Sequence, residues 1–431
     1  MIIPSTYTSN NRPPPEKKSI SSAIKKIVLW LIPITLGLGI YPLLIPALLC
    51  TAFYCSKTLV LQCKTTIATP SFKFLTILIC IFFWCYWNFF IPYHPDTLKM
   101  SWGYFPVLIT LSIITVTWIG FSNNLISVIE FLWLFCLGAL IWCLISVAAT
   151  LAIKSPPFYT SVIDIRYLIL GETRFINTPG MSNLLALFPI VFLAGFILKP
   201  NQRPPGFWII GIAGFILSIC AGFFISQRSY FLLALIITPL IVSIFLSLIG
   251  SWRSLAIITP LLVSYPFLHW INSALGNIFL NRPINEGLVQ DGRFQMLWFW
   301  LGNFIDNPFQ RGGVGLPSST YQQWFHNFFA DIHRLSGFWA LLAAVVLVSY
   351  IFFRVICVIR LDRRFGLFLM AIAIPCFLIM NTSVVPEGER QPFLLLIAIG
   401  AIAEVALAQE KRKAKNSQIT ASSLPISKNT S

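Results

Sequence analysis

Long apolar stretches recur along the chain, and they constrain its fold more than any other feature. Ten of them reach the roughly 20 residues that an α-helix needs to cross a bilayer. Only 10% of the residues are charged, whereas soluble domains carry about 25%. The sequence therefore predicts an all-α integral membrane protein, with spans at 74–92, 102–121, 125–153, 180–198, 207–225, 229–249, 254–275, 337–359, 367–384 and 392–408.

A further apolar region, 20–62, has Gly37, Gly39, Pro42 and Pro46 near its middle. The region predicts either one long helix or a hairpin of two. Parity favours the hairpin, because the basic N-terminus and the "KRKAK" tail are both expected in the cytoplasm and the number of spans must then be even. Ten spans and a hairpin predict about twelve transmembrane helices.

These spans divide the chain into five segments. We expect a polar cytoplasmic N-terminal tail (1–19), transmembrane helices one to nine (20–275), one large periplasmic loop (276–336), helices ten to twelve (337–408) and a cytoplasmic tail (409–431). The last segment is charged and then rich in Ser and Thr, a composition that predicts disorder.

The distribution of positive charge supports this orientation. The segments expected in the cytoplasm hold 20 Lys and Arg residues, and the periplasmic segments hold ten, of which eight are Arg. The excess inside follows the positive-inside rule, so the net charge of +16 needs no nucleic-acid partner. Arginine binds phosphate with a bidentate fork. The arginine-rich outer face therefore predicts a phosphorylated ligand.

Two arginines stand at positions that suit an anion. Arg293 follows Asp291, a good helix N-cap, and a helix from there would end before Asn307. In its first turn Arg293 either shares an anion with free backbone N–H groups or pairs with Asp291 or Glu286. Arg228 lies in a short turn between two spans, where it either faces a polar cavity or snorkels to the surface.

The stretch "QWFHNFFADIHRLSG" (323–337) carries two of the four histidines. Histidine titrates near neutrality, so His326 is a candidate general base. His326 and His333 are seven residues apart and would share a face of a continuous helix. No HExxH pattern is present, and we predict no metal site. The glycine-rich turn after Arg311 lacks the ending of a P-loop and predicts a flexible turn.

The order of these pieces is informative. An arginine after a short turn is followed by "DGR…W", then "NPFQRGGVG", then "HNFF…GFWALL". This order resembles the O-antigen ligase and polymerase superfamily of bacterial polyisoprenoid-dependent glycosyltransferases, whose pattern is roughly SGR…W, NP–Gly–x–Gly, and HN before an apolar stretch and Gly. The resemblance covers about 180–350, and the layout of twelve spans with a large loop after the ninth is similar.

The resemblance implies a GT-C-type membrane glycosyltransferase in the bacterial inner membrane. It would move a glycan from an undecaprenyl-diphosphate donor to an acceptor at the periplasmic face, with no metal, cofactor or nucleotide sugar. Arg228 and Arg293 would bind the donor diphosphate, and His326 would act on the acceptor. Supporting roles are assigned to Asn327, Arg311, Arg174 and Arg390. Arg311 departs from the family pattern and leaves the acceptor open.

Several functions remain open at this point. A ligase would use lipid A–core as acceptor and a polymerase would use another lipid-linked glycan; the intact His-Asn pair favours the ligase slightly. A transporter of small anions such as bicarbonate would need an ionisable residue well inside a span, for which Glu130 is the candidate. A structural scaffold predicts that replacing Arg293 or His326 changes nothing.

Overall fold

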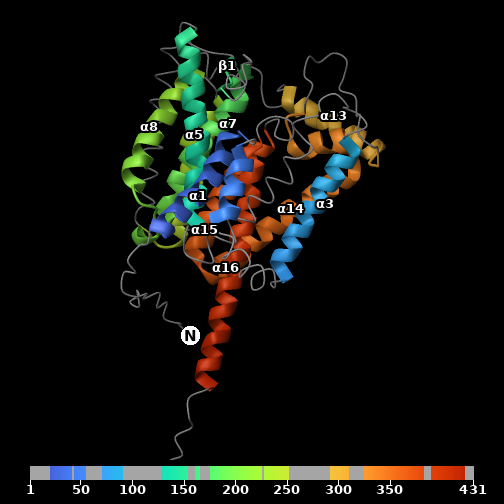
Figure 1. Cartoon of the computed structure of the whole chain (residues 1–431). Coiled ribbons are helices and arrows are strands. Elements are labelled where there is room, and N and C mark those ends of the chain that lie inside the picture. Colours follow the sequence, from blue (N-terminus) through green and yellow to red (C-terminus); the bar gives the residue numbers. More distant parts are fainter. Residues whose placement is uncertain are drawn as a thin grey trace, which may run out of the picture.

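We describe the fold from a computed structural model of the chain (Figure 1). It describes residues 20–40, 43–54, 70–90, 128–153, 161–165, 175–225, 228–251, 292–309, 325–382 and 390–422. The helices are α1 (Ile20–Leu38), α3 (Pro70–Phe90), α5 (Val128–Ile153), α7 (Thr178–Ala194), α8 (Phe207–Ile225), α9 (Arg228–Phe231), α10 (Thr238–Leu248), α13 (Gly292–Asp306), α14 (Phe328–Leu361), α15 (Arg363–Met380) and α16 (Gln391–Ser422).

Shorter elements join the helices. Strands β1 (Ser161–Ile163) and β2 (Phe175–Asn177) form an antiparallel pair in which Val162 lies opposite Ile176. Two 3₁₀ turns, η3 (Gly195–Ile197) and η4 (Pro200–Gln202), connect α7 to α8, and a π-helical segment, η5 (Leu232–Ile237), connects α9 to α10. Apart from β1 and β2, the described regular structure is helical.

Among the described residues, seven helices are long and apolar enough to cross a membrane. They are Ile129–Ile153, Gly180–Ile197, Phe207–Ile225, Ser229–Leu248, Phe328–Leu361, Arg363–Met380 and Gln391–Lys411. Each overlaps a span expected from the sequence, so the chain has the helices of a multi-pass membrane protein. The expected spans 102–121 and 254–275 lie outside the described residues, and the total of twelve stays a prediction.

The apolar region 20–62 contains two helices. Helix α1 ends at Leu38, and Gly39 follows with a φ of 69°, its N–H donating to the carbonyls of Thr35 and Leu36. A glycine in this left-handed conformation is a common helix stop. A second helix spans Leu44–Tyr54. One long helix, the alternative left open by the sequence, is therefore excluded for this region.

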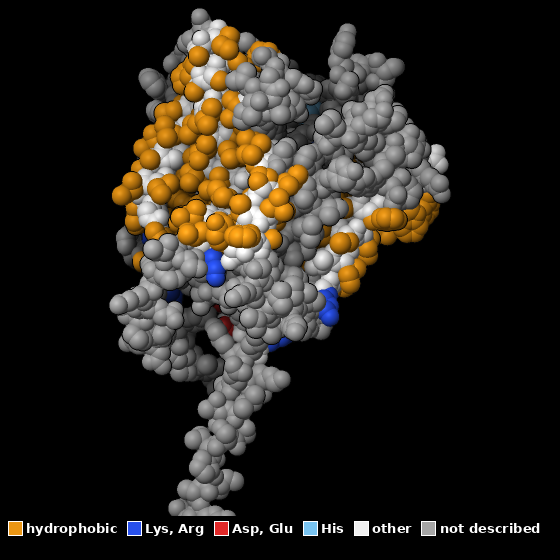
Figure 2. All heavy atoms as spheres, in the orientation of Figure 1, with side chains coloured by type: hydrophobic (Ala, Val, Ile, Leu, Met, Phe, Trp, Pro, Cys, Tyr) orange, Lys and Arg blue, Asp and Glu red, His pale blue; other side chains and the backbone are white. Residues whose placement is uncertain are grey.

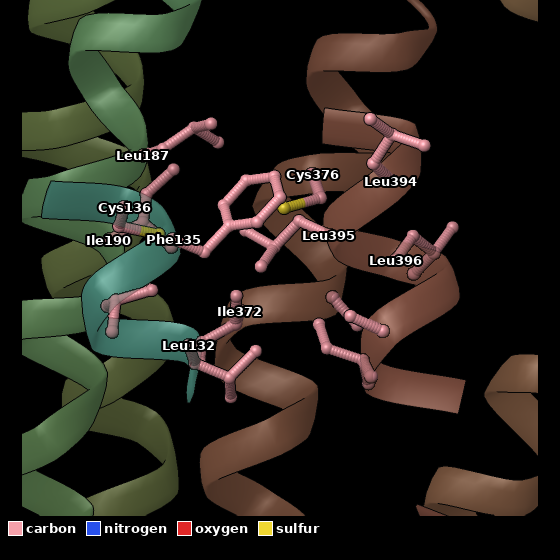
Figure 3. Close-up of a cluster of buried hydrophobic side chains, with 14 of the residues drawn as sticks. Leu132, Phe135, Cys136, Leu187, Ile190, Ile372, Cys376, Leu394, Leu395 and Leu396 are labelled. Carbon is pink, nitrogen blue, oxygen red and sulfur yellow. The ribbon is translucent and has the colours of Figure 1, made fainter. Parts of the chain in front are cut away.

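The interior of the bundle is formed by α5, α7, α15 and α16. Figure 3 shows Leu132, Phe135 and Cys136 of α5 pointing towards Cys376 of α15 and Leu395 of α16, and these side chains are buried. By contrast α8 carries Ile209, which is 80% exposed. Hydrophobic side chains cover much of the face that includes α5 and α8 (Figure 2). Such a surface suits contact with lipid and would promote aggregation in water.

Helix α14 changes direction where the sequence predicts the end of the large loop. Gly337 has φ 78° and ψ −170°, which interrupts the helix. The kink separates a first part, 328–336, from the long apolar part that follows. The hydroxyl of Ser336 donates to the carbonyl of Tyr86 at 2.9 Å and ties the kink to α3. The predicted boundary between 276–336 and 337–408 thus coincides with a glycine kink within one helix.

The C-terminal segment differs from the sequence expectation. Helix α16 continues to Ser422 and projects from the bundle (Figure 1), whereas we expected disorder from residue 409. The segment after Ala408 contains Gln, Glu, Lys, Arg and Ala, which are strong helix formers, and lacks Gly and Pro up to Ser422. Helix propensity and continuation from a formed helix therefore outweigh the polar composition over 409–422, and 423–431 lie outside the described residues.

Candidate functional site

His326 has an unusual backbone. Its φ is +54°, and among the described residues it is the only non-glycine residue with a positive φ. This left-handed conformation costs an L-residue on the order of 1 kcal/mol, although His adopts it more often than most. Its neighbour Phe325 is buried at 1% exposure, whereas His326 is partly exposed. His326, the residue predicted to act as base, is therefore strained and partly accessible, and it lies next to the buried Phe325.

Asn327, the second residue of the His-Asn pair, begins helix α14. Its side-chain oxygen accepts from the backbone N–H groups of Phe329 and Ala330, each at 3.1 Å, as an N-cap does. Its amide nitrogen donates to the side-chain oxygen of Asn381 at 3.0 Å. Asn381 ends α15 and donates to the carbonyl of Phe377 at 2.8 Å. Asn327 therefore joins the start of α14 to the end of α15.

Asp331 reaches back from the first turn of α14. Its Oδ1 accepts from the backbone N–H of Phe325 at 2.9 Å, and the residue is fully buried. The Nε atom of Arg334 lies 3.9 Å from the same oxygen. The other carboxylate oxygen, Oδ2, has no hydrogen-bond partner within the described part of the chain. Sequence reasoning did not place this carboxylate against the residue before His326, because the contact spans the loop-to-helix boundary.

His333 links the surface helix α13 to α14. Trp300 Nε1 donates to His333 Nδ1 at 3.2 Å, and His333 Nε2 lies 3.2 Å from the carbonyl of Pro308. These partners assign a neutral ring with its proton on Nε2. His333 is buried, and its ring also contacts Phe304. The prediction that His326 and His333 share a helix face is wrong, because the helix begins only at Phe328.

Arg293 lies in the first turn of α13, where the sequence predicted it, and α13 ends at Asp306, before Asn307 and Pro308. Asp291, the expected N-cap, lies outside the described residues. The structure describes the backbone of Arg293 and not its side chain. Further along the first half of α13, Met296 is buried and Trp298 is 60% exposed. Phe299 and Trp300 pack inward with Met296, whereas Trp298 and Ile305 point outward, as expected for a helix at a membrane surface.

Arg228 is the first residue of α9, and here too only its backbone is described. The two residues after it are fixed by hydroxyl pairs. The Ser229 and Ser182 hydroxyl oxygens lie 2.9 Å apart, and the Tyr230 and Ser218 hydroxyl oxygens lie 2.7 Å apart. Hydroxyl pairs of this kind hold membrane helices together. Helices α7 and α8 therefore fix the backbone that carries Arg228.

A π-helical segment, η5, follows α9 directly. Pro239 lacks a backbone N–H and so cannot form the hydrogen bond that an α-helix would make there, and the Thr238 hydroxyl donates to the carbonyl of Leu233 at 2.7 Å. Such segments are rare and occur often at functional sites. Hydropathy treats 229–249 as one span and contains no signal for this change of helix type.

The remaining arginines named from the sequence are only partly placed. Arg390 precedes α16, is partly exposed, and accepts a backbone hydrogen bond from Leu394 at 3.0 Å. Arg311 and Arg174 lie outside the described residues. The structure thus brings His326 and Asn327 together with Asp331 and Asn381, and it leaves the predicted arginine cluster a prediction.

Among the described residues, two ion pairs connect different helices of the bundle. Glu404 of α16 is buried, accepts from the Tyr350 hydroxyl at 2.6 Å, and accepts from Arg354 Nη2 at 2.8 Å. Lys26 Nζ lies 3.0 Å from Glu130 Oε1. Sequence reasoning named Glu130 and missed Glu404, although a carboxylate inside 392–408 is itself the signal. Because each carboxylate has a cationic partner, these residues join helices: α1 to α5 and α14 to α16.

No group of three or more His, Cys, Asp and Glu side chains that could hold a metal ion is found within the described ranges. No protein-family model matches the chain, and a search of curated proteins finds no significant similarity. The functional conclusion therefore depends on the residues themselves and on the order of motifs in which they occur.

Proposed function

We propose that this chain is a GT-C-type membrane glycosyltransferase with about twelve spans. It moves a glycan from an undecaprenyl-diphosphate donor to an acceptor at the periplasmic face of the bacterial inner membrane. Lipid A–core is the favoured acceptor, as in an O-antigen ligase; a lipid-linked glycan, as in a polymerase, is the alternative. The observation that carries the proposal is the left-handed backbone of His326 within the ordered motifs.

Strain at a single residue supports a functional role. Glycine adopts a positive φ without steric cost, and asparagine tolerates it well, so the backbone conformation by itself does not require histidine at position 326. Strained residues persist where the surroundings impose the conformation, and they gather at active sites. The chain keeps an imidazole at a backbone conformation that strains every residue except glycine, which is expected if the imidazole performs chemistry.

The chemistry follows from these residue types. An acceptor hydroxyl attacks the sugar carbon that bears the diphosphate; the new carbon–oxygen bond forms as the bond to the diphosphate oxygen breaks. The proton of the hydroxyl passes to the imidazole of His326, since histidine is the side chain most often used as a general base. Negative charge accumulates on the departing diphosphate. Guanidinium groups at Arg228 and Arg293 stabilise this charge, and preorganised donors are most effective where water is excluded.

The experiment uses purified protein in proteoliposomes with an undecaprenyl-diphosphate glycan and one of two acceptors. A ligase extends lipid A–core, whereas a polymerase lengthens the lipid-linked glycan. Uptake of labelled bicarbonate into the same vesicles tests the transporter alternative. Absence of glycan transfer to both acceptors from a folded protein, with bicarbonate uptake present, would contradict the proposal.

A further inference from the structure

The backbone before His326 is tied to α14. The N–H of Phe325 donates to Asp331 Oδ1 at 2.9 Å, so a carboxylate six residues later fixes the peptide that enters His326. Both residues are buried, and the ring of Phe325 stacks on Phe299 of α13 at a centroid distance of 6.5 Å. A buried hydrogen bond is protected from competing water. The entry to His326 is therefore fixed in position.

The backbone after His326 is tied to α15. Asn327 uses its side-chain oxygen to cap α14 and its amide nitrogen to donate to Asn381 Oδ1 at 3.0 Å. The next residue, Phe328, is buried and packs on Phe393 of α16 at 4.8 Å between ring centroids. His326 thus lies between Phe325 and Asn327, which are each held by hydrogen bonds, and it connects them in a conformation with positive φ.

The hydrogen bond to Phe325 N–H does not by itself explain why residue 331 is an aspartate. Its second oxygen is buried without a hydrogen-bond partner among the described residues, and leaving part of a carboxylate unsatisfied in the interior is unfavourable. A serine or asparagine could accept from Phe325 N–H without burying a charge, although neither would pair with Arg334. We propose that Asp331 and Asn381 are positioning residues that hold His326 in its left-handed conformation. This inference rests on the proposed function in one respect, that His326 is the base whose placement matters.

Placement matters because a base must lie within hydrogen-bond reach of the proton that it removes. A displacement of about 1 Å at a reacting group lowers the rate by up to about 100-fold. Loss of either tether therefore lowers kcat about 10- to 100-fold while the KM for the lipid-linked donor stays within about two-fold, because the donor is held elsewhere.

The first test measures strain and needs no activity. In the wild-type background His326→Gly raises the melting temperature in detergent by about 1–2 °C, because glycine removes the strain. His326→Ala, which keeps a Cβ, gives no such gain. In the Asp331→Leu background the gain from His326→Gly disappears, because the released backbone relaxes. An equal gain in both backgrounds overturns the positioning role, whatever the catalytic role of His326.

The second test measures turnover per folded protein. Asp331→Asn keeps an oxygen for Phe325 N–H and retains most activity, whereas Asp331→Leu loses it. Asp362→Leu is the matched control, because Asp362 accepts from Phe365 N–H at 3.1 Å at the start of α15 and is not tied to residues 325–327. It lowers stability and leaves kcat unchanged. Asn381→Leu supplies the second tether variant if Asp331→Leu fails to fold.

The outcomes separate the two proposals. Wild-type kcat in folded Asp331→Leu and Asn381→Leu proteins overturns the positioning role. Full activity in His326→Ala overturns the base assignment and leaves the strain measurement to decide whether Asp331 and Asn381 hold the backbone.

Discussion

At His326 the side chain and the backbone make opposite demands. The proposed chemistry requires the imidazole, whereas a φ of +54° favours glycine. We expect His326→Ala to lower transfer about 10²- to 10⁴-fold, the usual range for a general base. Binding of the donor should survive, because the proposal assigns the diphosphate to Arg228 and Arg293. Transfer of lipid-linked glycan in detergent, beside donor binding, measures both; wild-type turnover would remove the assignment.

His333 is the control within the same segment, and its burial changes what we expect of it. Replacing it by Ala leaves Trp300 Nε1 and the Pro308 carbonyl without their present partner. That loss lowers the free energy of unfolding by about 1–3 kcal/mol. Activity per folded molecule should fall less than in His326→Ala. Thermal unfolding in detergent separates the two effects, and a stable His333→Ala protein as inactive as His326→Ala would reverse the assignment.

Arg228 and Arg293, which we propose to bind the donor diphosphate, are tested by a substitution that keeps the positive charge and removes the planar guanidinium group. Lysine at position 228 or 293 supplies one ammonium group, which cannot form the bidentate fork. We expect Arg228→Lys and Arg293→Lys to fail in donor binding nearly as badly as the Ala variants. Isothermal titration with a soluble diphosphate analogue measures the binding. Full activity in both Lys variants would exclude a bidentate role.

At the scale of the helices, glycines determine how closely α1 and α5 approach. A Cβ at Gly37 would meet the backbone oxygen of Phe135, and a Cβ at Gly138 would meet that of Ile34. Small residues allow such close crossings in membranes. Gly37→Leu or Gly138→Leu should therefore lower stability by about 1–3 kcal/mol through overpacking. Unfolding in detergent measures the change.

Gly302 of α13 is the matched control for these substitutions. A Cβ there meets nothing within 4 Å, so Gly302→Ala should stabilise the helix by about 0.5–1 kcal/mol. If Gly37→Leu and Gly302→Ala shift the melting temperature alike, the close crossing of α1 and α5 is not present in the folded protein.

Hydropathy predicts the spans because each is a continuous run of apolar residues that can be recognised without knowledge of the rest of the fold. It does not predict the glycine kink at Gly337, the π-helical η5, or the helix after Ala408, since these depend on single backbone angles and on continuation from a neighbour. The same reason applies at the site. The His-Asn pair is visible in the sequence, whereas the bonds from Asp331 and Asn381 join residues whose proximity only the fold creates.

At the scale of the molecule, β1 and α13 lie at one end of the bundle and the projecting part of α16 lies at the other (Figure 1). Helix α7 starts directly after β2, so the turn that contains Asn201 lies at the end opposite β1. Arg203 closes this turn by donating to the carbonyls of Gly195 and Leu198. A guanidinium at a helix C-terminus is electrostatically favourable, and a basic end agrees with the expected cytoplasmic side.

Orientation in the membrane is the last prediction, and two asparagines test it as a matched pair. Asn201 and Asn307 are both exposed. Asn307 directly follows α13, which lies at the β1 end of the bundle (Figure 1), whereas Asn201 lies in the turn between α7 and α8. In a cysteine-free background, an impermeant maleimide should label Asn307→Cys in cells whose outer membrane alone is permeabilised. It should label Asn201→Cys only after the inner membrane is opened, because lysines and arginines concentrate on the cytoplasmic side. The reverse pattern would move His326 to the cytoplasmic face, where the proposed periplasmic transfer does not occur.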